Sequence, residues 1–282
     1  MSETLAMDDL AAKRARLDAI LRDLGGVVVA FSGGVDSAYL LAAASDALGD
    51  RCVGATAVSA SLAGDELEIA RRIAAALGVR HVIVRTREFE DSRYLRNDAG
   101  RCYFCKQALF TRLAELADGL GFPHVAYGAN TDDVADYRPG MRAATEFRVH
   151  APLLDAGLGK AEIRTLARLR GLEVWDKPAS PCLSSRLPFG TSVTLQALAQ
   201  VEQSERVLHE LGFRDVRVRH HGDTARIEVP LPDVPRLLGL VSRVTPALQA
   251  IGYRHVFVAP DGLRPGRLAA GIPSAGGPGP RL

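Results

Sequence analysis

The sequence predicts an α/β fold in which a doubly wound parallel sheet is followed by a smaller C-terminal α+β domain. Three observations predict it. Short apolar runs rich in valine and isoleucine alternate with helical stretches over roughly the first two thirds of the 282 residues. A glycine turn joins the first of these runs directly to a helix, and beyond residue 190 the order changes to helix, strand, strand, helix, strand. The composition, with 47% hydrophobic and 24% charged residues, is that of an ordinary globular protein.

The first domain is expected to begin with a helix over 8–24, because its apolar residues fall on or near one face. Apolar runs with β-branched residues predict strands, and stretches of helical periodicity between them predict helices. The expected strands are 27–31, 52–58, 81–85 and 124–127, and the further helices are 38–44, 65–77, 103–116 and 160–170. Ligands of doubly wound sheets bind beyond the carboxyl ends of the strands. The loops after the first, second and fourth strands should therefore face one crevice.

The second domain is expected to start near Leu187–Gly190, where the pattern changes. Its expected elements are a helix over 194–211, strands 215–220 and 225–229, a helical segment within 233–251 and a strand over 253–258. We therefore expect a catalytic domain over 1–188 and an α+β domain for substrate binding or oligomerisation over 189–268. The stretch 269–282 is rich in glycine and proline, which predicts a disordered tail.

The bulk properties exclude several classes of protein. No apolar run approaches the ~18 residues of a transmembrane helix, and the acidic start is unlike a signal peptide, so no membrane association is expected. Four cysteines are too few for a disulfide scaffold in a chain of this length, which favours the cytoplasm. A net charge of +2 gives no broad electrostatic footprint for nucleic acid, and none is expected as a partner.

The most informative motif is Ser32–Ser37, SGGVDS, between the first strand and its helix. A strand, a glycine turn and a helix N-terminus bring backbone N–H groups together, and the helix dipole favours an anion there. The motif lacks the lysine and spacing of a Walker A loop. It resembles the SGGxDS loop of the PP-loop ATP pyrophosphatases, which implies that Ser32, Gly33, Gly34, Asp36 and Ser37 hold ATP. The alternative is a simple turn.

Three of the four cysteines are candidate ligands. Cys102 and Cys105 are three residues apart at the start of a helix and so share one face, and Cys182 lies in a Ser/Pro-rich loop. Three thiols are an awkward number for structural zinc but suit a [4Fe–4S] cluster with one open iron. A redox CxxC pair and a single nucleophilic Cys182 with an incidental CxxC remain open. Cys52, inside an apolar strand, is expected to be a core thiol.

Several charged residues are candidates for substrate contacts. Lys106 follows the CxxC and either is solvated or faces phosphate. Arg217 and Arg219 alternate along one strand and share a face, where they suit carboxylate or phosphate groups; ordinary surface ion pairs are the alternative. Glu205, on the preceding helix, would orient these arginines, act as a base or simply be solvated. His220 and His221 lack a third spaced ligand and are expected at the surface.

Four stretches together resemble a specific family. They are Asp132–Arg142, Pro152–Arg164, Trp175–Arg186 and Arg217–Glu228, and in that order they look like the LarE family. The similarity covers nearly the whole chain except its tail. One departure is Pro181, which precedes Cys182 where a small residue such as alanine is usual.

This resemblance implies an ATP-dependent sulfur transferase of nickel-pincer nucleotide synthesis. Such an enzyme adenylylates the carboxylates of pyridinium-3,5-biscarboxylate mononucleotide and converts them to thiocarboxylates. The resemblance also implies that Asp36 helps to hold Mg²⁺, that Gly128, after the fourth strand, lies beside the nucleotide, and that Lys106 offsets phosphate charge. Arg217 and Arg219 would hold the substrate, with Ser185 and Arg186 as further phosphate contacts.

The cysteines place the chain among the members of that family that resemble cluster enzymes. The resemblance thus implies a [4Fe–4S] cluster on Cys102, Cys105 and Cys182, a separate sulfur donor and a nucleotide substrate. A homo-oligomer is the default expectation. The alternatives are a tRNA thiolase of the PP-loop class and an amide-forming PP-loop ligase.

Overall fold

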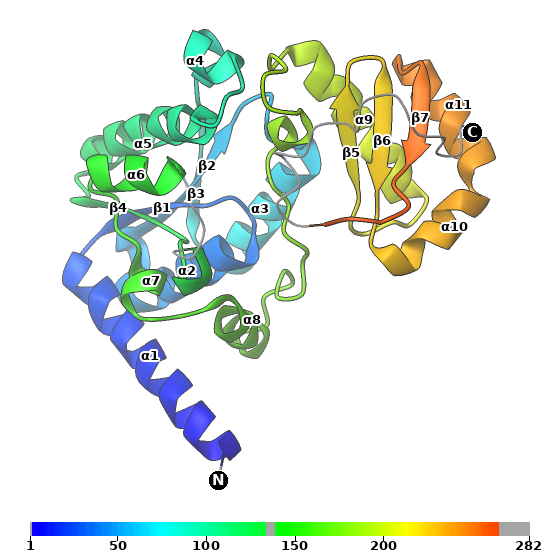
Figure 1. Cartoon of the computed structure of the whole chain (residues 1–282). Coiled ribbons are helices and arrows are strands. Elements are labelled where there is room, and N and C mark those ends of the chain that lie inside the picture. The colour runs from blue at the N-terminus through cyan, green and yellow to red at the C-terminus, as the bar shows by residue number, and fades with distance from the viewer. Residues whose placement is uncertain (1, 134–138, 265–282) are drawn as a thin grey trace. The chain divides into compact units, whose positions relative to one another are not determined.

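The computed structural model of the chain describes residues 2–133 and 139–264, and it divides into two compact units (Figure 1). The first unit consists of Met1–Asp91 and Gly100–Ala179, and the second of Ser92–Ala99 and Ser180–Leu282. The division thus falls between Ala179 and Ser180. The boundary expected near residue 188 stays a prediction for limited proteolysis, and the expected tail over 269–282 lies outside the described residues.

The first unit contains a four-stranded parallel sheet in the order β3-β2-β1-β4. Its strands are β1 (Val27–Ala30), β2 (Cys52–Val58), β3 (Arg80–Arg85) and β4 (His124–Tyr127). A single parallel bridge between Ala126 and His150 extends it beyond β4. The predicted parallel α/β fold is confirmed.

Helices cover both faces of this sheet. They are α1 (Ser2–Leu24), α2 (Val35–Leu48), α3 (Gly64–Ala76), α5 (Arg101–Leu120), α6 (Pro139–Glu146), α7 (Pro152–Asp155) and α8 (Lys160–Leu169), with single turns η1 (Gly49–Arg51), η2 (Glu88–Glu90) and η3 (Thr131–Asp133). Because side chains of a strand alternate between faces, Val27 and Val29 join one apolar core, made with α1, α2, α3 and α8. Val28 joins the other, made with α5 and α6.

The strand order places the phosphate loop at a switch point of the sheet. From β1 the chain crosses to β2 on one side, whereas β4 lies on the other side of β1. In open α/β sheets the crevice at such a reversal is where ligands bind. The loops after β1 and β4 are therefore neighbours, as the sequence predicted.

The second unit is built on a three-stranded sheet in the order β5-β6-β7. β5 (Arg217–His221) and β6 (Thr224–Glu228) are antiparallel, and β7 (His255–Val258) runs parallel to β6. Its helices and turns are α4 (Ser92–Leu95), η4 (Leu183–Arg186), α9 (Leu195–Glu210), η5 (Leu231–Asp233), α10 (Val234–Gly239) and α11 (Val241–Ile251). An apolar core joins α9, α10 and α11 to one face of the sheet.

Two expectations for individual elements were wrong. His220 is buried, with its ring nitrogen 3.0 Å from the hydroxyl oxygen of Tyr253, rather than at the surface. The helix expected to stop at residue 116 continues to Leu120, because the helix-ending residue is Gly121 in a left-handed conformation. Cys52 is buried in β2 as expected.

No helix among the residues described, 2–133 and 139–264, is long and apolar enough to cross a membrane.

Candidate functional site

The SGGVDS loop forms the turn between β1 and α2 that the sequence predicted. The hydroxyl of Ser37 donates to the carbonyl of Gly34 at 3.1 Å and accepts from the backbone N–H of Ser32 at 3.2 Å. The hydroxyl oxygens of Ser32 and Ser37 are 3.1 Å apart. The first N–H groups of α2 have no partner within the helix and point out of its N-terminus. The loop therefore presents donors and a positive dipole end to an anion.

Two glycines let neighbouring backbone approach this loop. Gly33 has φ +76°, and a β-carbon on it would lie 3.2 Å from the carbonyl oxygen of Glu66 in α3. Gly128, directly after β4, lies against the start of α2. A β-carbon there would be 2.9 Å from the backbone nitrogen of Ser37 and 3.1 Å from the carbonyl carbon of Asp36. Gly128 therefore lets the loop after β4 pack directly against the start of α2.

The carboxylate of Asp36 is hydrogen-bonded through one of its two oxygens, to a residue that the sequence patterns did not single out. One carboxylate oxygen accepts a hydrogen bond from the ammonium of Lys160, the first residue of α8. The other oxygen, Oδ1, is buried and has no hydrogen-bond partner among the described residues. An anionic oxygen in this state suits a metal cation beside phosphates. A lysine in the first turn of a helix opposes the helix dipole, and this was the signal that could have revealed Lys160.

A second lysine lies against the phosphate loop. The ammonium of Lys177 is 2.6 Å from a carboxylate oxygen of Glu66 and 3.5 Å from the carbonyl oxygen of Gly33. Arg164 holds the segment that carries it, because its guanidinium donates to the carbonyls of Trp175 and Lys177. Lys160 and Lys177 thus bring two positive charges to the loop from distant parts of the sequence.

The CxxC motif opens α5 in the first unit. Cys102 is exposed and Cys105 is half-buried, and neither forms a disulfide bond within the described residues. Lys106 lies on the same helix with its ammonium 5.6 Å from the ring centroid of Phe110. Gly140 packs against its stem, since a β-carbon there would lie 3.0 Å from Cγ of Lys106.

Cys182 lies in the second unit, at the residue before the η4 turn, and its side chain is exposed. The backbone around it is held by Arg186. Nη1 of Arg186 donates to the carbonyl of Pro181 at 2.6 Å and to the hydroxyl of Ser185 at 3.0 Å. Its Nε and Nη2 bind the two carboxylate oxygens of Glu205 at 2.8 and 3.0 Å.

Arg219 also binds this loop. Its Nη1 donates to the carbonyl of Ser185 at 2.8 Å and its Nε to Glu228 at 2.9 Å. Arg217 lies on the same face of β5 but is less buried than Arg219. Burial and the nearby charges of Arg186 and Arg219 lower the pKa of Arg217 from its ordinary value. An anion that neutralised this charge would be bound favourably.

Cys102, Cys105 and Cys182 are thiol donors of the type that iron–sulfur clusters use. Cys102 and Cys105 are one helical turn apart, Cys182 is exposed, and the fourth thiol, Cys52, is buried in β2. Burial raises the pKa of the Cys52 thiol to about 12, so it is a poor ligand. Within residues 2–133 and 139–264 no group of three or more His, Cys, Asp or Glu side chains is arranged to hold a metal.

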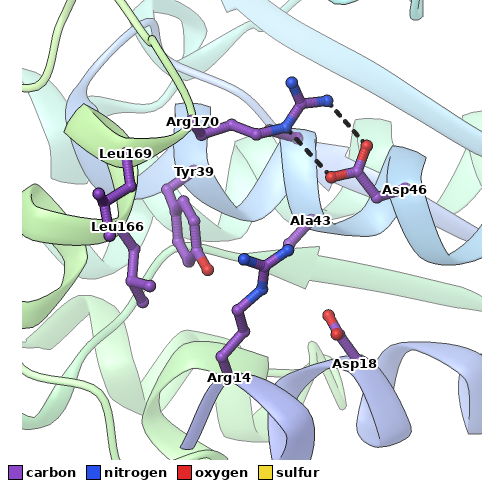
Figure 2. A pocket seen from close by; sticks show the side chains of 9 residues that line it. Arg14, Asp18, Tyr39, Ala43, Asp46, Leu166, Leu169 and Arg170 are labelled. Carbon is purple, nitrogen blue, oxygen red and sulfur yellow. Dashed lines mark hydrogen bonds and ion pairs between the residues drawn. The ribbon is translucent and has the colours of Figure 1, made fainter. Parts of the chain in front are cut away.

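A separate pocket lies between α1, α2 and α8 in the first unit (Figure 2). It encloses about 70 Å³, and Figure 2 shows the Arg170–Asp46 ion pair, 2.8 Å long, along one side and Arg14 and Asp18 of α1 on another. No residue of the Ser32–Ser37 loop lines it. The pocket is therefore separate from the nucleotide crevice.

Comparison with known proteins gives one family match and several full-length relatives. The profile of the asparagine synthase family matches residues 18–98, which include the phosphate loop. A protein of Synechocystis sp. described as uncharacterized is 40% identical over 261 residues, 92% of this chain and 97% of that protein.

Other relatives have named activities of two kinds. The pyridinium-3,5-bisthiocarboxylic acid mononucleotide synthase of Lactiplantibacillus plantarum is 38% identical over 263 residues, 93% of this chain and 95% of that protein. A tRNA-specific 2-thiouridylase of Rickettsia rickettsii is 30% identical over a smaller part, 66% of this chain and 61% of that protein.

Proposed function

The chain belongs to the LarE family, whose named relative is a pyridinium-3,5-bisthiocarboxylic acid mononucleotide synthase, and on that premise we propose that it has the same activity. It is a sulfurtransferase of an ATP-utilising PP-loop family. Its substrate would be pyridinium-3,5-biscarboxylate mononucleotide, and each carboxylate would become a thiocarboxylate.

The observation that carries this proposal is the arrangement around the N-terminus of α2. Backbone donors, the helix N-terminus against which Gly128 packs and the ammonium groups of Lys160 and Lys177 suit a polyphosphate. The unpartnered oxygen of Asp36 would hold Mg²⁺, which would neutralise charge on the phosphates. Ser32, Gly33, Gly34 and Ser37 form the rest of the cradle.

The first step would be activation of a carboxylate. A carboxylate oxygen of the substrate attacks the α-phosphorus of ATP, the bond to the β-phosphate oxygen breaks, and pyrophosphate leaves. We assign Lys106 to offset the charge of the phosphates. Arg217, whose pKa is lowered by burial and by like charges, would hold the substrate phosphate or carboxylate with Arg219 beside it.

The second step would replace AMP by sulfur. A sulfur nucleophile attacks the acyl carbon of the adenylate, and AMP leaves with the electron pair of the C–O bond. We propose that Cys102, Cys105 and Cys182 hold a [4Fe–4S] cluster, which when bound would supply sulfide at the iron that no thiolate holds. The chain's part is to present these thiols and to hold the Cys182 loop through Arg186 and Arg219.

The cluster proposal has a direct analytical test. Anaerobically purified protein should contain about four irons and four acid-labile sulfides per chain, and each of Cys102→Ala, Cys105→Ala and Cys182→Ala should lose them. Cys52→Ala should retain them, because that thiol is buried. No iron after anaerobic reconstitution would contradict the cluster and leave Cys182 as a persulfide carrier or consumed sulfur donor.

The activity itself is tested by substrate dependence. With Mg-ATP, pyridinium-3,5-biscarboxylate mononucleotide should stimulate pyrophosphate release, and mass spectrometry should detect thiocarboxylate products. Unmodified tRNA is the matched negative control, because a thiouridylase is among the relatives. Stimulation by tRNA alone would replace our proposal with tRNA thiolation.

We further propose that the enzyme acts in the cytoplasm as a homo-oligomer and is supplied by a separate sulfur donor.

A further inference from the structure

The guanidinium of Arg186 is buried and engaged inside the second unit. Its side chain is only 5% exposed, and its Nε and Nη2 make a two-pronged ion pair with Glu205. Nη1 contacts the loop around Cys182: the carbonyl of Pro181 at 2.6 Å, the carbonyl of Cys182 at 3.4 Å and the hydroxyl of Ser185 at 3.0 Å. An anion from solvent would have to break these bonds to reach it.

Glu205 connects this arginine to the sheet. The side chain of Glu205 is 9% exposed, and its Oε1 also accepts the backbone N–H of Val218 in β5 at 2.9 Å. A continuous series of hydrogen bonds thus runs from β5 through Glu205 and Arg186 to the carbonyls on either side of the Cys182 α-carbon.

A second buried ion pair holds the other end of the same turn. Arg219, 10% exposed, pairs with Glu228 and donates to the carbonyl of Ser185 at 2.8 Å. The η4 turn is a single 3₁₀ turn of four residues, and the Ser185 N–H donates to the Cys182 carbonyl before it at 2.9 Å. Its geometry therefore depends on the arginine side chains that grip its carbonyls.

Buried ion pairs seldom stabilise a protein more than apolar side chains of the same size would, because both charges must be desolvated. Two such pairs on one short loop indicate that the loop's conformation matters. The exposed thiol of Cys182 is the reactive group that this conformation presents.

We propose that Arg186, held by Glu205, is a positioning residue for the Cys182 thiol and not a ligand of substrate phosphate. The proposal rests on the proposed function, since the position of this thiol matters only if Cys182 takes part in sulfur transfer. It replaces the sequence-based expectation that Arg186 contacts phosphate.

The test compares Arg186→Met and Arg186→Lys with the control Arg206→Met. Arg206 lies on α9 near Glu205 but is 54% exposed, so its loss should have no effect. For Arg186→Met we expect the KM values for ATP and substrate and the first-turnover rate of pyrophosphate release to stay within about twofold of wild type. The yield of thiocarboxylate per pyrophosphate released should fall at least about tenfold. Lysine should not restore it, because an ammonium cannot make the two-pronged contact.

A second measurement does not depend on activity. Hydrogen exchange of the Ser185 and Leu187 amides, both bonded within the turn, should be faster in Arg186→Met, while amides of β5 and β6 remain protected. If that variant does not fold, Glu205→Gln, which keeps the side-chain shape, should show the same changes more weakly.

Two results would overturn the proposal. One is a substrate KM raised about tenfold with an unchanged yield of thiocarboxylate per pyrophosphate, which would make Arg186 a substrate ligand. The other is unchanged exchange of the two turn amides. If wild-type protein forms no thiocarboxylate, the proposed function fails, but the exchange experiment still decides whether Arg186 fixes the loop.

Discussion

At Gly128 the nucleotide crevice has no room for a methyl group. Replacing it by alanine would place a β-carbon 2.9 Å from the backbone nitrogen of Ser37, so the start of α2 must shift. Overpacking of this kind typically costs about 1–3 kcal/mol, here directed at the phosphate cradle. We expect Gly128→Ala to weaken ATP binding about tenfold or more, measured by equilibrium dialysis.

The control for this prediction is Gly119→Ala. Gly119 lies in α5, and a β-carbon there would meet nothing within 4 Å. Alanine at an exposed helical position should leave ATP binding unchanged and stabilise the helix by up to about 1 kcal/mol. Equal ATP affinity in wild type and Gly128→Ala would show that the helix end does not hold phosphate.

Asp36 forms an ion pair with Lys160, and the sequence indicated Asp36 but not Lys160. Asp36 belongs to a contiguous motif whose spacing itself indicates phosphate chemistry. Lys160 is 124 residues away and reaches Asp36 only because α8 packs beside α2. For the same reason the sequence identified Arg186 and Glu205 as chemically interesting but not as partners of each other. Contacts of that kind depend on tertiary packing, which local patterns do not encode.

The helix α9 begins with an N-terminal cap made by the residue directly before it in the sequence. The hydroxyl of Thr194 accepts the backbone N–H of Ala197 at 3.1 Å. We expect Thr194→Ala to lower the free energy of unfolding of the second unit by about 1 kcal/mol in urea titration, because one helix donor loses its partner. Thr194→Ser keeps the oxygen and should cost much less. An alanine variant as stable as wild type would contradict the cap.

The segment Ser92–Ala99 belongs to the second unit although the chain on either side of it belongs to the first, and the sequence patterns did not predict this. Apolar runs were enough to place all four strands of the first sheet, since a buried parallel strand has a strong local pattern. The segment Ser92–Ala99 is instead joined to the rest of the second unit by hydrogen bonds of single side chains. Tyr94 binds the Ser184 hydroxyl at 2.7 Å, and Asn97 donates to the carbonyls of Pro188 and Thr191 at 2.8 Å each. Nothing periodic in the sequence reports such contacts.

At the scale of the whole molecule, buried and half-buried histidines make stability depend on pH. Burial lowers the pKa of His81, His124 and His220 from the ordinary value of 6.5. Below that value the unfolded chain binds protons that the folded chain does not, so stability falls as the pH decreases. We expect a lower Tm at about pH 5.5 than at about pH 7.5. A double variant, His124→Gln with His220→Gln, should depend less on pH, and equal Tm values for wild type would contradict this account.

The stability of the fold at alkaline pH depends on two other groups, Cys52 and Tyr39. Burial raises the pKa of Cys52 from 9.0 to about 12 and that of Tyr39 from 10.0 to about 12. The unfolded chain therefore loses these protons first, and stability should fall as the pH rises above about 9. Thermal unfolding across this range, compared with Cys52→Ala, would show whether the buried thiol contributes.

Different residues carry the two steps of the proposed reaction, although both units contribute to it. The phosphate loop, Asp36 and Lys160 of the first unit would serve activation of the carboxylate. Sulfur delivery would depend instead on Cys182 of the second unit, together with Cys102 and Cys105 of the first. Activation of the carboxylate and delivery of sulfur should therefore be separable by mutation.

This separation is tested by measuring the pyrophosphate and the thiocarboxylate that wild type and Cys182→Ala form from the same Mg-ATP and substrate. We predict that the variant still forms acyl-adenylate and releases pyrophosphate but yields no thiocarboxylate. Loss of pyrophosphate release together with sulfur transfer would show that Cys182 has a structural role instead. Undiminished thiocarboxylate formation would show that sulfur reaches the substrate without this thiol, and either result would contradict the account.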